Sequence, residues 1–126
     1  MCLNIVYRGK QKKEALAKLP ENGYYWKVVV RLRGKYYSPI HRGDGSYKYG
    51  WNSTPKKSNN ASYYLAFHIW RTKEAGMYAQ NIMSTQNNNR KYLVRCKIDK
   101  NDIINIGSQW GRLCIVTTRF WCPKPK

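Results

Sequence analysis

The stretch YYWKVVVRLR at residues 24–33 decides the fold, because it is rich in aromatic and β-branched residues that favour a strand. The segment from Arg33 to Tyr36 predicts a tight type II′ turn with Gly34 at its first central position. A short return strand follows and ends before Pro39, which has no backbone N–H to donate to a ladder. These residues predict an antiparallel hairpin within a larger sheet.

The segments on either side of this hairpin predict two helices and further strands. Residues 10–19 (KQKKEALAKL) contain good helix formers and stop at Pro20. Thr72 is placed to cap a second helix that runs to about Met83. We expect further strands at residues 63–70, 91–98, 103–106 and 113–122, and a short one at residues 47–51.

The order of these elements predicts a single α+β domain, and 126 residues is a usual length for one domain. We expect a mainly antiparallel sheet with two helices packed on one face over residues 1–122, and a basic tail at residues 123–126. Gly107 should end the strand before it. The core-facing stripe of the second helix should consist of Ala75, Tyr78, Ala79 and Ile82.

Charge is the property that most restricts the function. The chain has 24 Lys and Arg against 6 Asp and Glu, a formal net charge of +18 at pH 7. Solubility needs a net charge of only about 2–8 for a small domain, and the excess repels itself in the compact state. Nucleic acid is the commonest polyanion that relieves such repulsion. We therefore predict DNA or RNA, free or within a nucleoprotein complex, as the partner.

Composition also excludes some classes of protein. A hydrophobic content of 42% is too high for a disordered, highly charged chain. The apolar runs are only a few residues long, so we predict no membrane span. The amino terminus shows no basic leader followed by an apolar stretch, and a cytoplasmic location is the expectation.

Aromatic rings interleaved with basic residues indicate where nucleic acid binds. Flat rings stack on bases while neighbouring cations hold phosphates, although about half of these rings are expected in the sheet core. We predict a contact surface made by the hairpin and the loop at residues 40–57, with charges from Arg31, Arg33, Lys35, Arg42, Lys48, Lys56 and Lys57 and stacking rings from Tyr36, Tyr47 and Trp51. The alternative surface consists of Arg90, Lys91, Arg95 and Lys97.

Candidates for catalysis or metal binding are few. The cysteines Cys2, Cys96, Cys114 and Cys122 contain no C-x-x-C pair, and the two histidines form no H-x3–5-H pair. Buried thiols without a metal are therefore the main prediction, and a four-cysteine zinc site from distant strands is the alternative. Arg8, His68 and Cys2 lack the acidic and polar partners that catalysis requires. We predict no catalytic residue and no cofactor.

Several segments together resemble a group of small uncharacterised phage and prophage proteins: MCL at residues 1–3, YYSPI at 36–40, AFHIWRTKEA at 66–75 and VRCKI at 94–98. The resemblance covers most of the chain, although Ala66 stands where that group tends to have Gly. It implies a phage-encoded protein that acts in the cytoplasm of a bacterial host against host defence. Inhibition of a nucleoprotein complex in the manner of anti-CRISPR proteins is the expected activity.

A second likeness is to the ADP-ribosyltransferases. Arg8-Gly9 after a short apolar segment, Thr72 before a helix, and a later strand at residues 93–95 resemble that family's pattern. The resemblance implies that Arg8 would hold an NAD phosphate. The family's Glu is missing, because the last third of the chain offers only Asp99 and Asp102 as acids. We therefore favour a binding protein over an NAD-dependent transferase, with a structural nucleic-acid-binding module as the other alternative.

Overall fold

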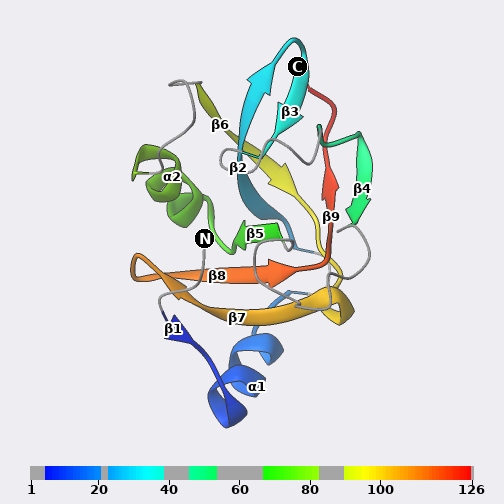
Figure 1. Cartoon of the computed structure of the whole chain (residues 1–126). Helices are drawn as coiled ribbons and strands as arrows, with labels where there is room; N and C mark the ends of the chain where they lie inside the picture. Colours follow the sequence, from blue (N-terminus) through cyan, green and yellow to red (C-terminus); the bar gives the residue numbers. More distant parts are fainter. Residues whose placement is uncertain (1–4, 21–22, 39–45, 54–66, 83–89, 126) are drawn as a thin grey trace, which may run out of the picture.

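A computed structural model describes residues 5–20, 23–38, 46–53, 67–82 and 90–125 (Figure 1). The elements are β1 (Ile5–Val6), α1 (Gly9–Ala17), β2 (Tyr25–Leu32), β3 (Lys35–Tyr37), β4 (Gly50–Ser53), β5 (Phe67–Trp70), α2 (Lys73–Ile82), β6 (Lys91–Cys96), a 3-10 turn (Lys100–Asp102), β7 (Ile103–Gln109), β8 (Arg112–Thr117) and β9 (Arg119–Cys122). These elements confirm the predicted α+β class. None of the helices described is long and apolar enough to cross a membrane.

The main sheet has the strand order β1-β7-β8-β5-β2-β3, and all of its described pairings are antiparallel. Strands β5 and β3 lie along the same edge of β2, where Trp26 pairs with Trp70 and Val30 pairs with Tyr37. Strand β6 occupies the other edge of β2. A second sheet of β4 and β9 adjoins the end of β6. Strand β2 is therefore the centre of the fold.

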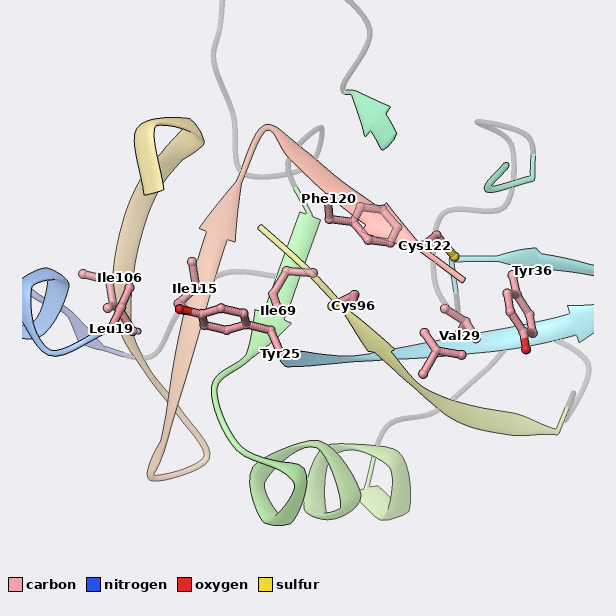
Figure 2. Packing of buried hydrophobic residues seen from close by; sticks show 11 residues of the cluster. Leu19, Tyr25, Val29, Tyr36, Ile69, Cys96, Ile106, Ile115, Phe120 and Cys122 are labelled. Carbon is pink, nitrogen blue, oxygen red and sulfur yellow. The ribbon is translucent and has the colours of Figure 1, made fainter. Parts of the chain in front are cut away.

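Alternate residues of β2 contribute to two core clusters on opposite faces of the sheet. Tyr25 and Val29 pack in the first cluster, which Leu19 covers from the end of α1 and Phe120 covers from β9 (Figure 2). The second cluster contains Val28 and is covered by α2 through two alanines. The expectation that both helices pack on one face was wrong, because the apolar residues of α1 pack with the first cluster and those of α2 with the second, on opposite faces of the sheet.

The turn between β2 and β3 differs from the predicted one. Leu32 pairs with Lys35, so that Arg33 and Gly34 are the two central residues. Both have positive φ, 53° at Arg33 and 77° at Gly34, which is the signature of a type I′ turn rather than type II′. The pattern of the flanking strands, not the glycine alone, sets this register.

Two other strand boundaries also differ from expectation. Gly107 lies inside β7 and does not end it. The position requires a glycine for another reason, because β1 passes so close that a Cβ would collide with the carbonyl oxygen of Ile5. The single long strand expected at residues 113–122 is divided into β8 and β9, with a bend at Thr118 that turns the chain sharply (Figure 1). This bend places β9 in the second sheet.

Helix α2 confirms the predicted cap, because the backbone N–H of Ala75 donates to Thr72 Oγ1 at 3.1 Å. Its buried side consists of the small residues Ala75, Gly76 and Ala79. A Cβ at Gly76 would press against the side chains of β2 and β6, so the helix approaches the sheet closely. Tyr78 and Ile82, which were expected in the core, are exposed because the close approach leaves room only for small residues.

Candidate nucleic-acid interface

The β2–β3 hairpin presents Arg31, Arg33 and Lys35 to solvent, as the sequence predicts. Four of the predicted cationic contacts are exposed, namely Arg31, Arg33, Lys35 and Lys48. The other three, Arg42, Lys56 and Lys57, lie outside the described residues. In the described part of the chain, this hairpin supplies charge without an exposed ring beside it.

Two of the three predicted stacking rings belong to the core. Tyr36 is only 6% exposed and packs in the first cluster, and its backbone bridges to that of Tyr47. The Tyr47 ring lies edge-to-face against Phe67 and Phe120, with centroids 5.9 and 5.0 Å away. Burial excludes the predicted stacking role of Tyr36, and the ring of Tyr47 is engaged with the core. Trp51 alone of the three is exposed, at 39%.

These core rings surround a buried cation. Lys27 is 6% exposed, and its Nζ donates to the carbonyl oxygen of His68 at 3.3 Å. The rings of Tyr47, Phe67 and Phe120 have their centres 5.6–5.9 Å from this Nζ. An ammonium group attracts the electron-rich faces of such rings. Lys27 thus lies in the interior and does not contribute to the exposed surface.

The predicted buried thiols are confirmed for Cys96, Cys114 and Cys122, and Cys2 lies outside the described residues. Burial raises the pKa of Cys114 to about 12 and that of Cys122 to about 11, although the charge of Lys27 opposes both shifts. These thiols therefore stay protonated at neutral pH and behave as small apolar groups. The described residues hold no cluster of three or more His, Cys, Asp or Glu placed to bind a metal.

A different surface combines exposed rings with cations. Four segments contribute to it: the residue before β2, the end of β6, strand β9 with the tail after it, and β4 with the residue before it. We call it the cation–aromatic face, and it consists of Tyr24, Tyr49, Trp51, Arg95, Lys97, Arg119, Trp121 and Lys124.

Strand pairing aligns the central residues of this face in one row. Trp51 pairs with Trp121 across β4 and β9, and Trp121 pairs with Lys97 through an isolated bridge. Tyr25 pairs with Cys96, which places the preceding Tyr24 beside Lys97. Residues directly opposite one another in a sheet project from the same face. The row therefore runs across four strands.

The side chains of the row are in contact with one another. The Arg95 guanidinium lies 4.1 Å from the centre of the Tyr24 ring. Lys97 Nζ lies 5.9 Å from the centre of the Tyr24 ring and 4.9 Å from that of Trp121. Tyr49 packs edge-to-face against Trp121 with a centroid distance of 5.8 Å. Lys97 thus lies between two rings of the row, Tyr24 and Trp121, and Arg95 lies against the first of them.

Arg119 holds one end of this face in place. Its Nε donates to Asp102 Oδ2 at 2.9 Å, and its terminal nitrogen lies 3.8 Å from Asp99 Oδ2. The same guanidinium lies 4.5 Å from the centre of the Trp51 ring. Asp99 in turn accepts the Asn101 backbone N–H at 2.9 Å, which fixes the 3-10 turn. The two carboxylates balance the charge of Arg119, and its guanidinium packs against the Trp51 ring.

Every carboxylate in the described part of the chain forms an ion pair with a cation other than Arg95 or Lys97. The pairs are Glu14 with Lys10, Glu74 with Arg112, and Asp99 and Asp102 with Arg119. Among the described residues, Arg95, Lys97 and Lys124 accordingly have no carboxylate within ion-pair distance. Their positive charge is available to an external anion.

The sequence contained part of this site. Arg95 and Lys97 belonged to the alternative surface, and Trp51 was a predicted stacking ring. The other residues of the face were not among the predicted contacts: Tyr24, Tyr49, Arg119, Trp121 and Lys124. The signal for Trp121 was the alternation in residues 119–122, where Arg119 and Trp121 face outward while the residues between and after them are buried. No pattern in the sequence indicated that β9 pairs with β4 and meets β6.

Three residues of the transferase likeness, Thr72, Asp99 and Asp102, have structural roles here. The Thr72 hydroxyl accepts the hydrogen bond that caps α2. Asp99 and Asp102, the acids of the last third, are both engaged by Arg119. Arg8 is exposed at the start of α1.

Comparisons with family models, with curated proteins and with solved structures found no match to this chain. Fold and site define a small antiparallel α+β protein with an uncompensated cationic surface that carries exposed rings.

Proposed function

We propose that this protein binds nucleic acid through the cation–aromatic face and acts as a binding protein without catalysis. The observation that carries the proposal is the placement of Arg95 and Lys97, without a described carboxylate partner, on the same face as the exposed rings of Tyr24 and Trp51. Cations release counterions from phosphates on binding, and rings provide flat apolar area for bases.

The net charge of +18 supports the same class of partner. A chain this basic gains stability when a polyanion neutralises its self-repulsion. Free DNA or RNA fits this role, and so does a nucleic-acid strand displayed by a host nucleoprotein complex. The second target corresponds to the anti-defence activity that the resemblance to phage proteins implies, in the cytoplasm of a bacterial host.

Fluorescence anisotropy with labelled oligonucleotides tests the proposal. The logarithm of the binding constant should fall linearly with the logarithm of the salt concentration, with a slope of about −0.7 to −0.9 per phosphate contact. The variant Arg95→Glu/Lys97→Glu should bind more weakly and show a shallower slope by roughly one to two contacts.

The hairpin offers a matched control. Arg31→Glu/Arg33→Glu changes the net charge by the same amount, and both residues are exposed away from the face. This control should retain most of the affinity, and both variants should keep the wild-type thermal midpoint. Equal losses in the two variants would show that net charge alone drives binding. Absence of binding at low salt to any nucleic acid would overturn the proposal and favour an acidic protein surface as the partner.

A further inference from the structure

We infer that the ligand of the cation–aromatic face is single-stranded nucleic acid, whose unpaired bases stack on the rings of the row from Tyr24 to Trp51. This inference rests on the proposed function and specifies the form of its ligand. It follows from three features of the face: the exposure of its rings, their alignment across strands, and the position of the cations between them.

The rings are exposed to an extent that core packing does not explain. Tyr49 is 59% exposed, Tyr24 is 48% exposed and Trp51 is 39% exposed. Large rings left in water forgo the free energy of burial, and a cluster of them marks a binding surface. In the paired bases of a duplex the flat faces are already stacked on one another, so only unpaired bases can use these rings.

The alignment of the row gives the path of the strand. Adjacent strands of a sheet lie about 4.8 Å apart, so the four positions from Tyr24 through Lys97 and Trp121 to Trp51 span roughly 14 Å. That length holds about four nucleotides at the stacked rise of ~3.4 Å, and fewer when the strand is extended. The face thus accommodates a short run of bases that crosses the strands.

The cations lie where the phosphates of such a run would pass. Lys97 stands between the rings of Tyr24 and Trp121, and Arg95 covers one side of Tyr24. At the far end, Lys124 Nζ lies 5.7 Å from the centre of the Tyr49 ring. Cations that flank exposed rings in this way can hold the phosphates of one strand while the rings stack on its bases.

The rings are held before the ligand arrives. Arg119 supports Trp51 and is itself fixed by Asp99 and Asp102. Tyr49 and Trp121 support each other edge-to-face. A site whose side chains are already ordered loses less conformational entropy on binding. Stacking on this face therefore retains most of its interaction free energy.

The test compares ligands that share a phosphate backbone and differ in their bases. Labelled single-stranded DNA, single-stranded RNA, the matching duplex, and an abasic DNA strand of equal length are titrated at the same salt concentration. We expect both single strands to bind at least tenfold more tightly than the abasic strand and the duplex. The DNA and RNA arms show which sugar the face prefers.

Ring variants assign the binding to the face. Tyr24→Leu and Trp51→Leu should each weaken single-strand binding by about fivefold to a hundredfold, and leave abasic binding unchanged. The matched control is Tyr78→Leu on α2, because this exposed ring also has an arginine, Arg112, at 3.6 Å from its centre. The control should bind as the wild type does. Thermal unfolding of each variant verifies that it is folded.

The outcomes separate this inference from the proposed function. Equal affinity for the abasic strand or the duplex would overturn single-strand stacking and leave nucleic-acid binding standing. Failure to bind any of the four ligands would overturn both. Loss of duplex binding in Arg31→Glu/Arg33→Glu with no effect of the ring variants would place the interface on the hairpin instead.

Discussion

Lys97 and Trp121 join the two sheets of this protein. Their backbones exchange hydrogen bonds, Lys97 N to Trp121 O at 3.3 Å and Trp121 N to Lys97 O at 2.9 Å. Their side chains also meet, with Lys97 Nζ 4.9 Å from the centre of the Trp121 ring. Because β6 belongs to the main sheet and β9 to the small one, this pair aligns the outer surfaces of both sheets. The cation–aromatic face depends on this junction.

Arg119→Leu should lower the free energy of unfolding by about 1 kcal/mol and weaken single-strand binding several-fold. The substitution removes two ion pairs and the guanidinium that supports Trp51. Urea unfolding and anisotropy measure the two effects. Arg112→Leu is the control, since Arg112 also combines an ion pair, to Glu74, with a ring contact. A similar loss of binding in the control would contradict the role given to Arg119.

Lys27→Met should raise the free energy of unfolding by about 1 kcal/mol. The ammonium is buried with one carbonyl acceptor, and its transfer from water costs more than the ring contacts return. Methionine fills a similar volume among the rings without this cost. Lys27→Ala should instead destabilise the protein, because it leaves a cavity. Chemical denaturation measures the free energy of unfolding of both variants. A destabilised Lys27→Met variant would show that the buried cation is a net stabiliser.

Arg33→Asn should stabilise the hairpin by roughly 0.5–1 kcal/mol. Arg33 adopts φ 53° at the first central position of a type I′ turn, where Asn is preferred and most other side chains are strained. Gly34→Ala should destabilise by about 1 kcal/mol for the converse reason, since Gly34 has φ 77°. Urea midpoints report both effects. An unchanged midpoint in both variants would mean that the hairpin unfolds before the rest of the protein.

Raising the pH above 9 should lower the free energy of unfolding of the wild type more steeply than that of the Cys114→Ala variant. Burial raises the pKa of this thiol from 9.0 in the unfolded chain to about 12 in the folded protein. Above pH 9 the unfolded chain releases this proton while the folded protein retains it, so stability is full below pH 9 and is lost as pH rises towards 12. Urea unfolding at pH 8, 9 and 10 measures both proteins. The difference between their free energies of unfolding should change by about 1 kcal/mol per pH unit above pH 9. If the free energies of unfolding of the two proteins fell in parallel with pH, the raised pKa of Cys114 would not contribute to the pH dependence of stability.

Local patterns predicted the elements whose signals are local. The aromatic and β-branched run of β2, the Thr72 cap of α2 and the alternation along β6 all appear in the structure close to their predicted positions. Propensity, capping and period-two burial act over a few residues, and a single sequence displays them. The net charge also belongs to this class, because it is a property of composition.

The turn and strand boundaries show where local signals become insufficient. Gly34 predicts a turn, but the choice between type I′ and type II′ depends on which residues of β2 and β3 pair. Gly107 resembles a strand break, yet its small size serves the close passage of β1. A glycine can serve a turn, a strand end or a close backbone approach, and the residues that lie near it in the folded protein determine which of these applies.

The sequence by itself determined the α+β class, the central strand and the excess of positive charge, because these follow from residue types and their spacing. Only the tertiary structure decided which rings are exposed. Tyr36 and Trp51 have the same local setting, aromatic residues among basic ones, yet Tyr36 lies in the core and Trp51 on the cation–aromatic face. The difference arises from strand pairing between distant segments, β4 with β9 and β9 with β6. Pairing between segments that are distant in sequence cannot be read from the local pattern of a strand. Every strand exposes its side chains alternately on two faces, and the packing partner determines which face is covered.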